Sequence, residues 1–337
     1  MFMKCQNPRT LKTGLVVPCR QCLACRINYR EAWKLRCLYE LDNWDSAAFI
    51  TLTFSDKYLL TKENPDSLDK KELQQFFKRL RLNAERKYGS HQEVNENGNE
   101  RSVSNKPIKY FACGEYGGER ERPHYHAIVF GMDNFNDDDR DLIKSSWNTS
   151  PDFRCEDWMF DKERGRDSAI QEVTPDDIAY VCGYVEKKLF GAEANSEYTL
   201  KGRTPPFSLM SQGLGLDFAL KNKERLFANA YTYTTTGKRI GLPAYLRDKL
   251  GINMAERLEK QEVKETKKQM LVRESQHLNA EFAKFLQKRG LTLTDSFLAS
   301  NNYERLFNQF YDEHLFSYAT QIYQNFLDKQ KLRGIRQ

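Results

Sequence analysis

Two histidines separated by one residue, His124 and His126, are the side chains of this sequence best suited to chemistry. Residues 124–130 are otherwise apolar or aromatic and are followed by Gly131, which predicts a buried strand. Alternate residues of a strand point to the same face, so both imidazoles would leave that face together. A strand presents two nitrogen ligands to one metal ion in this way.

A carboxylate, Glu115, completes this candidate metal group. It stands nine residues before His124, directly after a second apolar stretch, residues 108–114. The turn-forming residues between the two stretches predict a hairpin that brings the carboxylate beside the imidazoles. Two imidazoles and one carboxylate suit a catalytic Mn²⁺ or Mg²⁺ that also holds a substrate oxygen. The alternative interpretation is a pair of core histidines with ordinary hydrogen-bond partners.

Two tyrosines, Tyr180 and Tyr184, are candidate nucleophiles. Thr174 as the N-cap and Pro175 at the first helical position predict that a helix begins here. Residues four apart share a helix face, and Lys187 lies about one turn beyond. A free phenol has a pKa of about 10, so attack on a phosphodiester needs a metal or a cation to stabilise the phenolate. An ordinary amphipathic helix is the alternative.

These motifs, together with the strand expected over residues 49–54, resemble the three motifs of HUH-type rolling-circle replication initiators. The paired tyrosines, the cysteine-rich start and residues 206–215 are similar to the initiators of microviruses, small single-stranded DNA phages, and particularly of the gokushovirus group. The resemblance covers roughly residues 1–250. It implies that Glu115, His124 and His126 hold the metal, and that the strand 49–54 lies beneath the site without being catalytic.

The activity that the resemblance implies is nicking and rejoining of single-stranded DNA at a phage origin. Tyr180 or Tyr184 attacks and leaves a 5′-phosphotyrosine and a free 3′-hydroxyl, while Lys187 orients the phosphate or neutralises the phenolate. A single-tyrosine relaxase or transposase, in which only Tyr184 matters, is one alternative. A non-catalytic, zinc-stabilised single-stranded DNA-binding protein is another.

Four cysteines near the start form a second candidate metal group. Close Cys-x-x-Cys spacing in a reducing cell indicates metal binding more readily than disulfides. A structural Zn²⁺ site is therefore expected, with free thiols as the alternative and an iron–sulfur cluster as a more remote one. The four residues are Cys5, Cys19, Cys22 and Cys25.

Positive charge gathers in the same part of the chain. Residues 1–36 hold eight lysines and arginines against one acidic residue, Glu31, although the whole chain carries a net charge of only +6. Arg26, Arg30 and Lys34 recur every four residues on an expected helix, and this stripe predicts contacts with single-stranded DNA phosphates. A solvated helix face is the alternative.

The rest of the sequence indicates a cytoplasmic protein that depends on partners. The chain has no apolar run long enough for a signal peptide or a membrane span, so we expect it to work in the cytoplasm of a bacterial host. It also has no G-x-x-x-x-G-K phosphate-binding loop, so a host helicase is expected to unwind DNA and a host polymerase to extend it.

The expected elements predict an α+β fold, a ferredoxin-like antiparallel sheet with packed helices. Residues 89–107 are expected to form a loop, and residues 158–160 and 168–173 short strands. A charged C-terminal region with helical periodicity predicts a helical extension. The expected segments are a basic cysteine-rich segment (1–47), an endonuclease core (48–190), an irregular covering segment (191–250) and the helical C-terminal region (251–337).

Overall fold

A computed structural model describes most of the chain up to residue 252 and parts of the remainder. The described residues are 5–14, 16–94, 98–118, 120–149, 153–184, 191–224, 226, 231–233, 239–252, 282–291, 306, 309–310 and 322–331. The chain divides into two compact units, Met3–Gly215 with Phe326–Gln337, and Met1–Phe2 with Leu216–Asn325. The candidate groups named above belong to the first unit.

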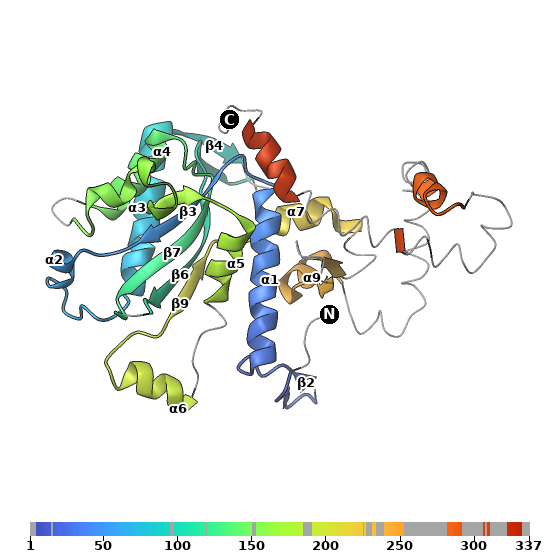
Figure 1. Ribbon diagram of the computed structural model, residues 1–337, viewed down its shortest axis with the longest axis horizontal. Helices are drawn as coiled ribbons and strands as arrows, with labels where there is room; N and C mark the ends of the chain where they lie inside the picture. Colours follow the sequence, from blue (N-terminus) through green and yellow to red (C-terminus); the bar gives the residue numbers. More distant parts are fainter. Residues whose placement is uncertain are drawn as a thin grey trace. The chain divides into compact units, whose positions relative to one another are not determined.

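The first unit is built on a five-stranded sheet in which every pairing is antiparallel, with the order β8-β3-β7-β6-β9 (Figure 1). Its strands are β3 (Ala47–Leu52), β6 (Lys109–Tyr116), β7 (Pro123–Phe130), β8 (Ile170–Glu172) and β9 (Phe207–Met210). The prediction of an antiparallel sheet with packed helices is confirmed. The fifth strand, β9, comes from the segment expected to be an irregular cover.

One face of the sheet carries the main hydrophobic core. Alternate strand residues such as Ile50, Ala112 and Ala127 point into it, as the period of two requires. The helices α3 (Lys70–Tyr88) and α4 (Asp137–Trp147) cover this face (Figure 1). Helix α3 supplies the apolar stripe predicted for it, and Asp69 caps its first turn by accepting from the N–H of Lys71 at 2.8 Å.

The opposite face is covered by α1 (Leu23–Leu41) and α5 (Pro175–Gly183) (Figure 1). Trp33 of α1 packs on Phe111 of β6, with ring centroids 5.1 Å apart. Helix α5 begins with a complete capping box, in which Thr174 and Asp177 each bond the other's backbone N–H. The predicted start of this helix is therefore confirmed.

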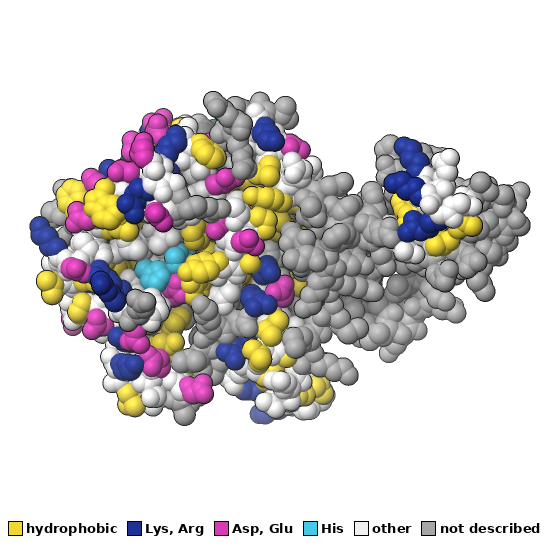
Figure 2. Space-filling view, in the orientation of Figure 1, with side chains coloured by type: hydrophobic (Ala, Val, Ile, Leu, Met, Phe, Trp, Pro, Cys, Tyr) yellow, Lys and Arg dark blue, Asp and Glu magenta, His cyan; other side chains and the backbone are white. Residues whose placement is uncertain are grey.

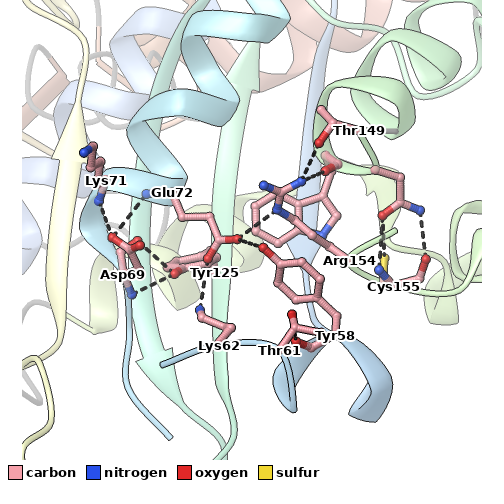
Figure 3. A network of polar contacts seen from close by, with 12 residues as sticks. Tyr58, Thr61, Lys62, Asp69, Lys71, Glu72, Tyr125, Thr149, Arg154 and Cys155 are labelled. Carbon is pink, nitrogen blue, oxygen red and sulfur yellow. Dashed lines mark hydrogen bonds and ion pairs between the residues drawn. The ribbon is translucent and has the colours of Figure 1, made fainter. Parts of the chain in front are cut away.

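A buried polar network ties the segment after β3 to α3, as Figure 3 shows. Glu72 accepts hydrogen bonds from Tyr58 (2.9 Å), Lys62 (3.1 Å) and Arg154 (2.8 Å). Arg154 also donates to the Trp147 carbonyl at 2.7 Å. Because an unpaired charge at this depth would be costly, the network fixes these loops against the core.

Two local expectations were wrong. Residues 89–107 do not form a loop, because β4 (Ser90–Val94) and β5 (Glu100–Ser104) pair as an antiparallel ribbon. The ribbon is largely exposed on both faces, so it shows no alternation of apolar residues. Residues 158–160 lie in a 3₁₀-helix, η1 (Asp157–Phe160), which buries Phe160 and exposes Trp158.

The remaining described elements are short. In the first unit they are β1 (Arg9–Thr10), β2 (Val16–Val17), α2 (Asp56–Leu59), η2 (Lys162–Asp167), α6 (Gly191–Ala194) and the π-helical turn η3 (Asn195–Thr199). In the second unit they are α7 (Leu216–Lys221), β10 (Tyr231–Tyr233), β11 (Arg239–Gly241) and α9 (Ala244–Leu250). Residues 282–287 and 322–331 are helical, and much of the predicted C-terminal helical region lies outside the described residues. None of the described helices is both long and apolar enough to cross a membrane.

Candidate metal and tyrosine site

Glu115, His124 and His126 meet on the face of the sheet that α1 and α5 cover. The β6–β7 register places Glu115 directly opposite His124. The Glu115 Oε1 atom lies 2.8 Å from His124 Nε2 and 3.0 Å from His126 Nε2. Neighbouring ligands on one octahedral ion, each about 2.1 Å from it, lie about 3 Å apart. The three side chains could therefore hold a metal ion, and Figure 2 shows histidine side chains at the surface beside acidic and hydrophobic ones.

The environment of His124 favours a cation at this point. Its Nδ1 atom lies 3.0 Å from the carbonyl oxygen of Arg122, which can only accept, so Nδ1 carries a proton. In a neutral ring the Nε2 lone pair would then face the carboxylate oxygen of Glu115. That contact requires either a second proton on His124 or a metal ion bound to both atoms. Arg122 itself is fixed by Asp56 and by the Phe54 carbonyl, to which it donates at 2.6 Å.

His126 has a partner that was not predicted from sequence. Thr51 is its register partner on β3, and the Thr51 hydroxyl lies 2.9 Å from His126 Nδ1. A hydroxyl can accept from Nδ1–H, and this leaves Nε2 free to bind a metal. The threonine stands in the strand motif 49–54, but nothing in that motif indicates which residue it faces across the sheet.

The ionisation of the group suits metal binding. Burial opposes ionisation of Glu115, but the hydrogen bonds and positive charge of His124 and His126 outweigh burial and lower the pKa of Glu115. Burial lowers the pKa of His126, and the hydrogen bond with Glu115 only partly compensates. Near neutral pH the site therefore offers an ionised carboxylate and a neutral His126 imidazole, the forms that bind metal ions.

Both candidate nucleophiles reach this group from α5. Tyr184 is the C-cap of the helix, so four residues still bring the two phenols together, with ring centroids 5.0 Å apart. The His126 ring lies 5.2 Å from that of Tyr180 and 5.9 Å from that of Tyr184. Burial is the largest cause that raises the pKa of each phenol, so both hydroxyls stay protonated at neutral pH.

The predicted cationic residues are placed only in part. Lys187 lies outside the described residues, which end at Tyr184 and resume at Gly191. Arg26, Arg30 and Lys34 lie on α1 and are half-buried. Arg30 and Lys34 both contact Glu31, at 2.9 Å and 3.5 Å.

The four N-terminal cysteines come together where α1 begins. Their sulfur atoms all lie within 4.8 Å of one another, with Cys5 and Cys22 at 3.9 Å and Cys19 and Cys25 at 4.0 Å. Four thiolates at 2.3 Å around a tetrahedral ion are about 3.8 Å apart. Hydrogen bonds from the backbone N–H groups of Gln6 and Cys25 lower the pKa of Cys22 to about 6. The group could therefore hold a second metal ion.

Comparison with known proteins places the chain among phage proteins. A family model for replication-associated proteins of the ORF2 type matches residues 47–189. The replication-associated protein VP4 of Bdellovibrio phage phiMH2K is 28% identical over 281 residues, which is 82% of this chain and 81% of that protein. The replication-associated protein ORF2 of Spiroplasma virus 4 is 30% identical over 244 residues, 68% and 66% of the two chains. The chain belongs to this family of replication-associated proteins.

A third relative, the replication-associated protein ORF4 of Chlamydia phage 1, is 27% identical over 240 residues, 69% of this chain and 53% of that protein. No solved structure matches the chain significantly. The family match spans β3, β6, β7, β8 and α5, which carry Thr51, the metal group and the tyrosines. The resemblance to phage replication proteins is confirmed, and a role in phage DNA replication follows from it.

Proposed function

We propose that the chain is a rolling-circle replication initiator that nicks and rejoins single-stranded DNA at a phage origin by tyrosine transesterification. One observation carries the proposal. Two phenols from α5 lie beside a carboxylate and two imidazoles on one sheet face, and the carboxylate contacts both imidazoles at 3.0 Å or less. A purely structural pair of histidines would not require two nucleophiles at the same place.

The reaction exchanges one phosphodiester for another. A tyrosine oxygen bonds to phosphorus, the bond from phosphorus to the 3′-oxygen breaks, and the 5′-phosphate stays on the tyrosine. The phenol proton leaves to solvent, and the released 3′-oxygen takes a proton from solvent, so no water is consumed. When bound, Mn²⁺ or Mg²⁺ would be held by Glu115, His124 and His126 and would stabilise negative charge on the phosphate oxygens.

A second tyrosine allows the strand to be closed again. It cuts the regenerated origin, and the new 3′-hydroxyl attacks the first phosphotyrosine to give a circle. Lys187 is proposed to orient the phosphate or neutralise the phenolate. Arg26, Arg30 and Lys34 are proposed to contact the single strand. A host helicase and a host DNA polymerase would supply unwinding and extension in the cytoplasm of a bacterial cell.

For the four cysteines we propose a structural Zn²⁺. In addition to their sulfur spacing, the N–H groups of Gln21 and Cys22 donate to the Cys19 sulfur, at 3.5 Å and 3.3 Å. Cys22 is the N-cap of α1, so the ion would anchor the start of that helix. Metal analysis should find one zinc per chain that a chelator removes only with loss of helical signal, whereas manganese at the other group should exchange freely.

The decisive experiment is to incubate the protein with Mn²⁺ and the circular single-stranded genome that encodes it. Covalent protein–DNA adducts are then sought on a denaturing gel. The adduct should need metal and disappear in the Tyr180→Phe/Tyr184→Phe double variant. His124→Ala and His126→Ala should each slow adduct formation about a thousandfold, because a bound metal supplies several kcal/mol of transition-state stabilisation.

His91→Ala is the matched control. This exposed histidine on β4 bonds Asn105 and Glu93, far in sequence from the site, and its loss should leave the adduct rate unchanged. Binding of DNA without any adduct, under every divalent metal tried, would favour the non-catalytic binding protein instead.

A further inference from the structure

The two candidate nucleophiles differ strongly in exposure. Tyr180 is 47% exposed, whereas Tyr184 is 8% exposed. Both tyrosines come from the same helix and contact the same imidazole, so the helix alone does not explain the difference. The difference lies in what each ring meets.

Tyr184 lies flat against the site. Its ring is nearly parallel to that of His126, with an angle of 11° between the planes, so one face of the phenol is covered by the imidazole. Tyr180 instead meets His126 and Phe49 edge-on, at 78° to each ring. Edge contacts leave the faces of the Tyr180 ring and its approach from solvent open.

We infer that Tyr180 makes the first cut and that Tyr184 is held back for the second. This inference rests on the proposed function. A nucleophile must come within about 3–3.5 Å of phosphorus, opposite the bond that breaks. A DNA strand arriving from solvent can place its phosphate beside Tyr180 as the side chain lies. It can reach Tyr184 only after that ring has moved off His126.

The first reaction itself supplies a reason for Tyr184 to move. A hydrogen bond joins the two phenols, with Tyr184 donating to the oxygen of Tyr180. When the Tyr180 oxygen bonds to phosphorus and the 3′-oxygen leaves, the phenol becomes a phosphate ester. The bridging oxygen of an ester is a much poorer acceptor than a hydroxyl, so the bond that helps to hold Tyr184 weakens. The second nucleophile is released when the first has been used.

The test uses a single strand carrying two copies of the cut site, so that two successive cuts excise a circle. Wild-type protein with Mn²⁺ is stopped at early times, its adduct is trimmed with nuclease, and the modified peptide is sequenced by mass spectrometry. The nucleotide should be found on Tyr180. This measurement needs no variant and therefore does not depend on how a variant folds.

Single substitutions give a second readout on the same substrate. Tyr180→Phe should slow the first adduct at least about 100-fold, since the exposed nucleophile is gone. Tyr184→Phe should keep the first adduct within about threefold of wild type and lower the yield of circles at least about 100-fold. Tyr198→Phe, which removes a phenol that packs on Tyr116 outside the site, is the matched control and should change neither product.

Two outcomes would overturn the inference in different ways. An early adduct on Tyr184, or a normal first adduct in Tyr180→Phe, would reverse the order while leaving the proposed function intact. Absence of any adduct from wild-type protein, under conditions where it binds DNA, would remove the proposed function and the order together.

Discussion

The two faces of the five-stranded sheet share the same strands but serve different ends. On β7, Tyr125 and Ala127 point into the hydrophobic core under α3 and α4. Their neighbours His124 and His126 point to the opposite face and contact Glu115. Because side chains alternate along a strand, one short segment can stabilise the fold with one set of residues and do chemistry with the other. Stability and activity should therefore respond to different substitutions.

The largest effect is expected on the core face. Phe77 of α3 is 1% exposed, and its ring stacks on that of Tyr110 with centroids 3.5 Å apart. Phe77→Ala should lower the free energy of unfolding by about 3–5 kcal/mol, since it removes a buried ring and leaves a cavity. Chemical denaturation measures the loss, and the adduct rate per folded molecule should stay close to that of wild type.

Leu82→Ala serves as the control on the same helix. Leu82 is 43% exposed, so its truncation should cost less than about 1 kcal/mol. If Phe77→Ala abolished the adduct in fully folded protein, the two faces would not act separately and the comparison would fail.

A smaller effect is expected from Thr51, directly beneath the site. Thr51→Val keeps the shape of the side chain but removes the hydroxyl that lies 2.9 Å from His126 Nδ1. The dissociation constant for Mn²⁺ should rise about 10–100-fold, as for other partners that orient a metal-binding imidazole. Electron paramagnetic resonance of free Mn²⁺ measures it without reference to activity.

Two further variants separate a role in orienting His126 from a role in packing. Thr51→Ser restores a hydroxyl and should recover most of the affinity. Thr53→Val removes a hydroxyl two residues along, where it contacts the Met159 sulfur at 3.4 Å, and should leave Mn²⁺ binding unchanged. Equal losses in Thr51→Val and Thr51→Ser would show that the hydroxyl is not what matters.

Much of this arrangement could be predicted from sequence because it depends on local rules. The alternation in 124–130 indicated which residues share a face, and Thr174 with Pro175 indicated where α5 begins. The turn residues between β6 and β7 predicted the hairpin that brings Glu115 to His124. Four-residue spacing then brought Tyr180 and Tyr184 together.

The features that were missed depend on pairing between distant segments. The Thr51–His126 contact follows from the register of β3 against β7, which lie 75 residues apart at that point. The β4–β5 ribbon has polar residues on both faces, so periodicity does not reveal it. The different exposure of Tyr180 and Tyr184 arises from ring packing around His126, which spacing along a helix does not determine.

The smallest expected effect tests whether DNA lies on the site face. The helix α1 covers that face and carries Arg30 and Lys34, which share Glu31 as a partner. Each residue that contacts a phosphate adds about 0.7 to the dependence of log affinity on log salt for a single strand. Arg30→Gln with Lys34→Gln should therefore reduce that slope by about 1.4, measured by fluorescence anisotropy with a labelled single strand.

Lys78→Gln with Arg86→Gln is the matched control, because it removes the same charge from the exposed side of α3, over the core face. Its slope should equal that of wild type if the strand runs along α1. An equal reduction in both variants would mean that binding follows net charge and not one face, because non-specific attraction responds to the summed charge of the protein. A reduction confined to the α1 variant would extend the difference between the two faces of the sheet to the helices that cover them.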